Sequence, residues 1–363
     1  MIDDLPDHGG QLHSLAARFG IPEAELLDFS ANINPEGPPA AVISTLRAGI
    51  EDLSTLTRYP DLEQAKLKRS IARYAGVSYQ NIAVANGFVP LLEAALQALP
   101  IRRCLLPVPA FVEYQKTLSR AQVDVVPHIL STDRCFNYDP DAMIEGNEDA
   151  VLLANPQNPS GVAHSCDAIV RIITKAAERS VFVLLDEAFI DYIPKYSVTQ
   201  LSNQFPNLIV FRSVTKFHGI PGLRVAYAVA HEQTARLLNE HLPPWPITTL
   251  ASDAVSAALE DDAYAHRARS LNEHRRTLLL SAIEALGLHA CPPAANFLLF
   301  RLPASVDPVV FWRQMLCEHR IVLRICSNYE GLCPGHMRVA IRGEEENARL
   351  LQAMRYTLKL VVG

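Results

Sequence analysis

Short apolar runs alternate with longer amphipathic segments through the middle of the chain. We expect the short, β-branched runs to be strands, and the longer segments, whose apolar residues recur at helical spacing, to be helices. Strands connected by crossover helices predict a mainly parallel sheet covered on both faces. The expected strands are Ile82–Ala85, Arg103–Leu106, Val123–Val126, Ala150–Ala154, Val181–Leu185, Leu208–Phe211 and Arg224–Ala230, and the expected helices include Leu91–Leu99, Val112–Arg120 and Ala168–Arg179.

The two ends of the chain have different patterns. The first forty residues are rich in proline and resemble an extended arm, and the pattern after Trp245 changes to long helices and then short strands. We therefore expect an α/β protein with an arm at residues 1–45, a large domain at 46–245 and a smaller α+β domain at 246–363. The late elements are helices within Ala251–Leu286, strands around Phe297–Arg301 and Met337–Ile341, and a closing helix at Glu344–Lys359.

Composition excludes several classes of protein. The chain has 363 residues, 20% of them charged, and its formal net charge of -6 is not gathered into blocks that would bind nucleic acid. The start lacks the pattern of a signal peptide, and no apolar run approaches the roughly 20 residues that cross a membrane. The seven cysteines are scattered without a C-x-x-C pair, which argues against a disulfide framework or a metal site. We expect a cytoplasmic protein that binds neither nucleic acid nor membrane.

The loop after Leu208–Phe211 carries a lysine between a hydroxyl and a guanidinium. Lys216 follows Ser213 by three residues and precedes Arg224 by eight. This spacing can bring hydroxyl and guanidinium to one phosphate while the amine reaches an aldehyde carbon. An amine near other cations loses its proton more readily and becomes a nucleophile, and a guanidinium binds oxyanions through two N–H groups. A surface lysine is the alternative, which these neighbours disfavour.

Two further polar residues follow expected strands. Asp186 ends the run Val181–Leu185, and Asn158 lies in a turn-forming segment after Ala150–Ala154. A carboxylate at the end of an apolar strand needs a partner, which could be a helix cap or the pyridine nitrogen of pyridoxal phosphate (PLP). The amide of Asn158 could donate to the phenolic oxygen of the same cofactor. Together with Lys216, these residues predict PLP.

These three stretches resemble the fold-type I PLP enzymes of the aspartate aminotransferase superfamily. Two further segments resemble the L-threonine-O-3-phosphate decarboxylases of cobalamin biosynthesis, which are close to histidinol-phosphate aminotransferases. The first is His8-Gly9-Gly10 with Asp28–Pro35, and the second is Arg324–Leu332 with Met337–Arg342. The resemblance extends from His8 to the final helix. It implies the fold-type I architecture, with a mainly parallel seven-stranded sheet in the large domain.

The resemblance also implies a role for each matching position. Lys216 would hold PLP as a Schiff base and act as the acid–base group, with Asp186 at the pyridine nitrogen and Asn158 at the phenolic oxygen. Ordinary packing is the alternative for Phe111 and Tyr59. Ser213, Arg224 and the backbone of Gly87, Phe88 and Val89 would bind the cofactor phosphate, and Phe111 would lie on the pyridine ring. Tyr59 would reach the neighbouring subunit's cofactor phosphate in a homodimer with shared sites. Arg324 and Arg338 would bind the substrate's anionic groups, and His8, Gly9 and Asn32 would close over the substrate.

Two positions depart from the family pattern. Phe189 stands where many aminotransferases have a tyrosine, although the decarboxylase branch tends to have phenylalanine there. Phe88-Val89-Pro90 stands where the family usually has polar residues, and Pro90 has no amide hydrogen. A lost hydrogen bond to a charged group costs about 1.5–3 kcal/mol, so we expect PLP to bind more weakly than is typical of the family.

The resemblance implies PLP-dependent decarboxylation of a small phosphorylated amino acid. The expected reaction converts L-threonine O-3-phosphate to (R)-1-aminopropan-2-yl phosphate for cobalamin biosynthesis. Whether the carboxylate or the hydrogen leaves the substrate's Cα depends on which bond stands perpendicular to the ring, which the sequence does not reveal. A histidinol-phosphate-type aminotransferase is the first alternative. A non-catalytic partner in the cobalamin pathway that keeps the PLP fold is the second.

Overall fold

The computed structural model describes residues 5–144 and 147–362, and a seven-stranded sheet forms the centre of the large domain. Six strands are parallel, and β8 runs antiparallel to them between β2 and β7. The mainly parallel sheet predicted from the sequence is therefore confirmed. In spatial order the strands are β2 (Ile82–Ala85), β8 (Ala226–Ala230), β7 (Leu208–Ser213), β6 (Phe182–Asp186), β5 (Ala150–Ala154), β3 (Arg103–Val108) and β4 (Asp124–Ile129).

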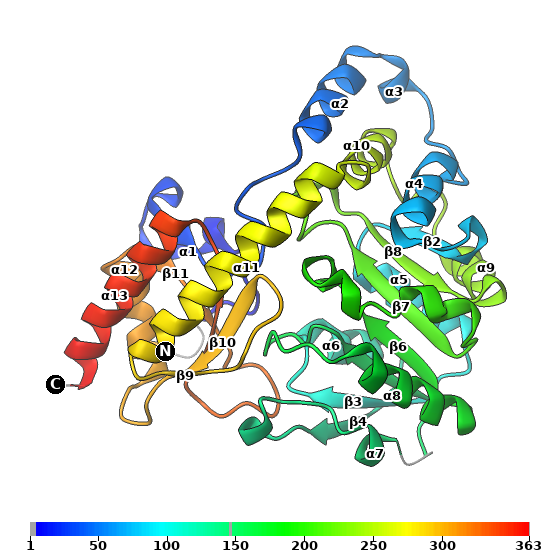
Figure 1. The fold of residues 1–363 in the computed structure, drawn as a ribbon. Helices are drawn as coiled ribbons and strands as arrows, with labels where there is room; N and C mark the ends of the chain where they lie inside the picture. Colours follow the sequence, from blue (N-terminus) through cyan, green and yellow to red (C-terminus); the bar gives the residue numbers. More distant parts are fainter. Residues whose placement is uncertain (1–4, 145–146, 363) are drawn as a thin grey trace.

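Helices cover both faces of this sheet (Figure 1). Successive strand residues point to opposite faces, so the apolar strands supply two separate hydrophobic layers. One face packs against α5 (Phe88–Ala98), α6 (Val112–Arg120) and α9 (Glu232–His241). The other packs against α8 (Cys166–Glu178) and, at the β2–β8 end, against α2 (Ala40–Glu51), α4 (Ala65–Ala75) and α10 (Thr249–Leu259). The short helices are α3 (Ser54–Thr57) and α7 (Pro140–Met143).

A second core lies beside the large sheet. It is built on an antiparallel sheet of order β12-β13-β10-β9 and a two-stranded parallel pair of β1 and β11. The helix α11 (Asp262–Ala285) runs from α10 to this second core (Figure 1). The other elements are α12 (Pro308–Cys317), α13 (Glu344–Val362), β1 (Leu27–Asp28), β9 (His289–Ala290), β10 (Phe297–Arg301), β11 (Ile321–Val322), β12 (Arg324–Ile325) and β13 (His336–Ala340).

The N-terminal arm differs from the extended segment that the sequence predicts. It contains the helix α1 (Leu12–Phe19), whose apolar residues at helical spacing pack on the second core. The ring of Phe19 lies 5.9 Å from that of Trp312 in an edge-to-face arrangement. Tertiary packing therefore stabilises a helix that is too short to persist alone. The domain boundary at residue 245 stays a prediction; α10, which follows it, packs against α2 and α4.

Strand ends determine where the polar residues lie. Asp186 is the last residue of β6, and β7 ends at Ser213, three residues before Lys216. Both strands are parallel, so their carboxyl ends lie at the same edge of the sheet, where ligands of such sheets bind. Within the described residues, no helix has both the length and the apolar character needed to span a membrane.

Candidate active site

A cavity of about 590 Å³ opens at this edge of the sheet. Residues from the large sheet, the N-terminal arm and the second core line it together. Every site residue predicted from the sequence lines this cavity except Tyr59. Tyr59 lies elsewhere, with 81% of its surface exposed and its ring 4.7 Å from that of Trp245.

Asp186 is buried beneath the cavity with two hydrogen bonds. The hydroxyl of Tyr114 donates to its Oδ2 at 2.5 Å, and the backbone N–H of Ala188 donates to its Oδ1 at 2.8 Å. Burial raises the pKa of the Asp186 carboxyl to about 6, although these two hydrogen bonds and the charge of Lys216 oppose the rise. The carboxylate is therefore ionised at neutral pH but destabilised, as expected for a group that pairs with a cation when a ligand binds.

Lys216 lies opposite Asp186 in the same cavity. Burial lowers the pKa of its amine to about 8, and the positive charges of Arg224 and Arg338 lower it further, against the attraction of Asp186. A sizeable fraction of the amine is therefore neutral near neutral pH and available as a nucleophile. The backbone N–H of Asn34 donates to the carbonyl oxygen of Lys216 at 3.0 Å, which ties the lysine loop to the N-terminal arm.

An oxyanion cradle surrounds the start of α5. Gly87 precedes the helix with a φ of 103°, and a Cβ at this position would lie 2.9 Å from Nη2 of Arg224. The helix N-terminus presents free backbone N–H groups, which favour bound phosphate. Ser213 and Thr215 add hydroxyl groups whose oxygens are 2.8 Å apart. Pro90 occupies the first helical turn, where N–H groups have no partner within the helix, so it does not disturb α5.

The residues present fit PLP. The cavity combines an amine with a lowered pKa, a buried carboxylate and a cradle of a helix N-terminus, two hydroxyls and a guanidinium. The aromatic ring of Phe111 lines the same space. Asn158 turns its Oδ1 toward Arg338, whose Nη1 donates to it at 2.6 Å, so its amide N–H groups remain for another acceptor. Phe189 packs against the ring of Phe297 at 4.9 Å and offers the cavity no hydrogen bond.

Two buried arginines line the part of the cavity next to the second core. Arg324 and Arg338 are paired across β12 and β13 and are 2% and 6% exposed. Arg324 donates to the carbonyl oxygens of Pro6, Asp7 and Ile325 and to Oδ1 of Asn328. Arg338 also donates to the carbonyl oxygen of Ser30 at 3.1 Å, and its Nε has no partner among the described residues. Among the residues that the structure describes, no carboxylate forms an ion pair with either guanidinium.

The N-terminal arm forms the remaining wall of the cavity. His8, Gly9 and Asn32 all lie there, and Asn32 is buried with its Oδ1 unpartnered among the described residues. A Cβ on Gly9 would lie 2.1 Å from the carbonyl oxygen of Ser30, so only glycine permits this approach of the two backbones.

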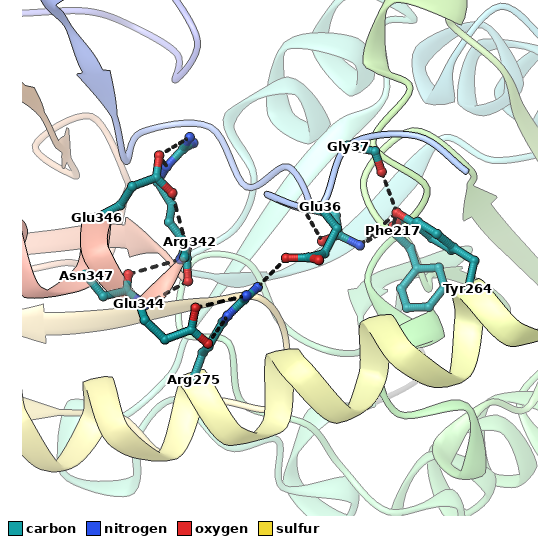
Figure 2. A network of polar contacts seen from close by, with 11 residues as sticks. Glu36, Gly37, Phe217, Tyr264, Arg275, Arg342, Glu344, Glu346 and Asn347 are labelled. Carbon is teal, nitrogen blue, oxygen red and sulfur yellow. Dashed lines mark hydrogen bonds and ion pairs between the residues drawn. The ribbon is translucent and has the colours of Figure 1, made fainter. Parts of the chain in front are cut away.

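A polar network fixes the arm between the two parts of the protein (Figure 2). Arg275 on α11 donates to Glu36 of the arm at 2.7 Å and to Glu344 at the start of α13. The Nδ2 of Asn34 donates to the carbonyl oxygen of Phe217 at 2.8 Å and to the hydroxyl of Tyr264 at 2.9 Å. The arm therefore contacts the second core and the lysine loop at the same time.

Four residues in or next to the cavity were not predicted from the sequence to act there. Glu113, which lines the cavity, and Tyr114, which contacts it only through Asp186, follow Phe111 at the start of the same helix, and Thr215 directly precedes Lys216. Their closeness to predicted residues was the available signal. The fourth is Tyr329, whose hydroxyl lies 3.4 Å from Nη1 of Arg338.

Comparison with known proteins identifies the family. Residues 24–354 match the family model described as aminotransferase class I and II. The chain belongs to this family. That membership confirms the fold-type I architecture and the superfamily resemblance inferred from the sequence, because members of the family share this fold.

Two curated relatives and one solved structure are similar over nearly the whole chain. A threonine-phosphate decarboxylase from Salmonella typhimurium is 33% identical, with coverage of 97% of this chain and 96% of the relative. Histidinol-phosphate aminotransferase 1 from Nitrosococcus oceani is 31% identical, with coverage of 97% and 93%. The crystal structure of histidinol-phosphate aminotransferase from Sinorhizobium meliloti in complex with pyridoxal-5'-phosphate has a TM-score of 0.86 and 21% identity, with coverage of 99% and 96%.

Proposed function

We propose that this aminotransferase-family protein uses PLP to decarboxylate L-threonine O-3-phosphate, giving (R)-1-aminopropan-2-yl phosphate for cobalamin biosynthesis. The observation that carries this proposal is the pair of buried cations at Arg324 and Arg338, neither with an acidic partner among the described residues. A buried cation without a counter-charge is costly even when neutral groups accept its hydrogen bonds, so such a pair favours a ligand with two anionic groups. Threonine phosphate carries a phosphate and a carboxylate, whereas histidinol phosphate carries only the phosphate.

PLP is the cofactor that the residues of the cavity support. Lys216 would hold it, Asp186 would pair with its pyridine nitrogen, and Asn158 would donate to its phenolic oxygen. The cradle of Gly87, Ser213, Thr215 and Arg224, with the amides of Phe88 and Val89, would bind its phosphate, and Phe111 would cover its ring. When bound, PLP withdraws electrons from the substrate's Cα so that one of its bonds can break.

The chain's own residues would direct which bond that is. Arg338, with an unpartnered Nε, and Arg324 would fix the phosphate and the carboxylate, and so the angle of the carboxylate at Cα. The carboxylate leaves as carbon dioxide, and a proton replaces it at Cα. Lys216 is suited to deliver that proton, because with a pKa of about 8 its amine exchanges protons near neutral pH.

The test is an assay of the purified protein with PLP. We expect a visible absorption band that Lys216→Ala abolishes, and then release of carbon dioxide from L-threonine O-3-phosphate without an added keto acid. Amino transfer that depends on a keto acid, with no carbon dioxide, would reject the decarboxylase in favour of the histidinol-phosphate-type aminotransferase. Absence of any PLP band would reject both enzymes and leave the non-catalytic partner.

We further propose that the protein works as a cytoplasmic homodimer with shared sites. The surface around Tyr59 supports a contact with a second copy, because Trp245, whose ring contacts Tyr59, is exposed, as are Leu53, Leu56 and Leu62 in the flanking segments of the chain. Apolar side chains gathered on one surface are typical of protein interfaces. All seven cysteines are free thiols, in keeping with a reducing compartment.

A further inference from the structure

A contact between His8 and Glu113 at the cavity has no part in the mechanism above. Nε2 of His8 lies 3.1 Å from Oε1 of Glu113, and the two side chains are 34% and 21% exposed. Glu113 is in the first turn of α6, and the His8 ring meets the ring of Phe111 edge-to-face at 6.4 Å. The pair therefore joins the N-terminal arm to the large domain across the substrate side of the cavity.

The backbone around His8 is fixed from the opposite side. Arg324 donates to the carbonyl oxygens of Pro6 and Asp7 at 2.9 and 2.7 Å, and Asn328 donates to that of Asp7 at 3.1 Å. On the other flank, the backbone N–H of Gly10 donates to Oγ of Ser30 at 2.9 Å. The imidazole therefore has a defined place, and its contact with Glu113 decides how the ring is turned.

This contact also decides which ring nitrogen carries the proton of neutral His8. A carboxylate can only accept, so Nε2 must be the protonated nitrogen when it meets Glu113. Nδ1 of the neutral ring is then an acceptor and has no hydrogen to offer a phosphate oxygen. When His8 is protonated, Nδ1 becomes a donor and the ring a cation, which is the form that binds a phosphate dianion.

The charges around His8 shift its pKa in opposite directions. Burial lowers its pKa most, and the positive charges of Lys116 and Arg324 lower it further, whereas Glu113 and Asp7 raise it. Nζ of Lys116 lies 3.2 Å from the same Glu113 oxygen that meets His8. Free His8 is therefore mainly neutral at neutral pH, and a bound dianion would draw a proton onto it.

We propose that Glu113 is a positioning residue for His8, fixing its tautomer and stabilising its protonated form, so that binding of the substrate's phosphate takes up one proton. The proposal rests on the proposed function and on the expectation from the family resemblance that His8, which lines the cavity, closes over the substrate. The proton comes from solvent, adds to Nδ1 and returns to solvent when the phosphate leaves. Phosphate binding thus becomes weaker as the pH rises, and Glu113 sets the pH range over which it weakens.

The test uses the PLP-loaded protein and isopropyl phosphate, which has the phosphate end of the proposed substrate without its amine or carboxylate. Calorimetric titrations in buffers of different ionisation enthalpy, from pH 7 to pH 9, measure the protons taken up. We expect Glu113→Gln to move the range of uptake to lower pH, and Lys116→Met to move it to higher pH, each by about half a pH unit. Glu93→Gln, which removes a carboxylate paired with Arg120 of α6 outside the cavity, should change nothing.

Opposite shifts from two substitutions on one helix separate this role from a structural one. Binding without proton uptake in the unmodified protein, or equal shifts in both variants, would overturn the proposal. If Glu113→Gln does not fold, Lys116→Met and His8→Asn still decide, because the latter must abolish the uptake. Carbon dioxide release is measured separately, so a failed decarboxylase assay with intact proton uptake rejects only the proposed function.

Discussion

The hydroxyl of Tyr114 donates a 2.5 Å hydrogen bond to the carboxylate of Asp186, with both groups buried. This bond lowers the pKa of Asp186 against the larger effect of burial. The bond therefore helps to keep the Asp186 carboxylate ionised, which is the form that would pair with the cofactor's pyridine nitrogen. PLP binding should accordingly depend on both residues.

Tyr114→Phe should weaken PLP binding near neutral pH. Loss of the hydrogen bond raises the pKa of Asp186 above about 6, so a larger fraction of the carboxyl is neutral at pH 7. A hydrogen bond to a charged group is worth about 1.5–3 kcal/mol, which corresponds to a rise in the pKa of about 1–2 units. The smaller ionised fraction at pH 7 should then raise the Kd for PLP by about twofold to tenfold. Titration with PLP at pH 7 and pH 9 measures the effect. Tyr138→Phe is the matched control, because that buried hydroxyl donates to the carbonyl oxygen of Ala154; an equal loss there would contradict the prediction.

Asp186→Asn should stabilise the cofactor-free protein while reducing its affinity for PLP. The pKa of the carboxyl is about 6 in the folded protein against 3.8 in the unfolded chain, so the folded state binds the proton more tightly. The ionised carboxylate therefore lowers the free energy of unfolding. This effect grows as the pH rises from about 4 to about 6, reaches about 3 kcal/mol and persists at higher pH. Thermal unfolding should give a higher Tm for the variant at pH 7.5 and a much smaller difference at pH 4. An equal or lower Tm at pH 7.5 would be the contrary result.

The reaction of Lys216 with pyridoxal, which lacks the phosphate, should accelerate as the pH rises through about 8. The amine is neutral only above its lowered pKa, and only the neutral amine attacks an aldehyde. Arg224→Gln should move this midpoint to higher pH, since Arg224 is the largest contribution after burial. Stopped-flow absorbance follows the reaction. Arg224→Lys keeps the charge and should keep the midpoint near its original value. The explanation is rejected if Arg224→Gln leaves the midpoint of the pH dependence unchanged.

Thr215→Val should reduce affinity for PLP severalfold without affecting pyridoxal. Thr215 lies with Ser213 in the cradle. Its hydroxyl can donate a hydrogen bond to the phosphate, which the apolar side chains of Phe88 and Val89 cannot do. Valine has nearly the same shape, so the fold should be retained. Comparing the Kd values of the two ligands isolates the phosphate contact, and a similar loss for pyridoxal would show that Thr215 acts elsewhere.

A mixture of two inactive variants should recover activity if Tyr59 serves the neighbouring subunit. We expect Lys216→Ala and Tyr59→Ala to be inactive or weak alone. In a hybrid dimer, one site has both Lys216 and the partner's Tyr59 intact, so unfolding and refolding the variants together should restore about a quarter of the normal activity in a random mixture. If the mixture is shown to contain hybrid dimers and no activity is recovered, Tyr59 lies outside the neighbouring subunit's site.

The sequence allowed the sheet and most of the site to be predicted, because strand ends are marked by a change from apolar to polar residues. Asp186, Asn158 and Ser213 all follow that rule. Boundaries were less certain where the backbone is unusual: β8 begins at Ala226 and not at Arg224, since Arg224 has a φ of 55°.

Partners distant in the chain could not be predicted. Tyr114 and Asp186 are 72 residues apart, and their hydrogen bond depends on how α6 packs on the sheet. The two short helical turns of α1 depend in the same way on Trp312, which no local pattern reveals.

The hydrogen bond from Arg338 to Asn158 means that the cofactor and substrate halves of the cavity are not energetically independent. An anion that draws the guanidinium of Arg338 toward itself alters the amide that faces the cofactor, and the reverse holds by thermodynamic reciprocity. Effects of substitutions at these two positions should therefore be non-additive. A weaker hold on PLP in an Arg338 variant would report this coupling and would not demonstrate that the arginine touches the cofactor.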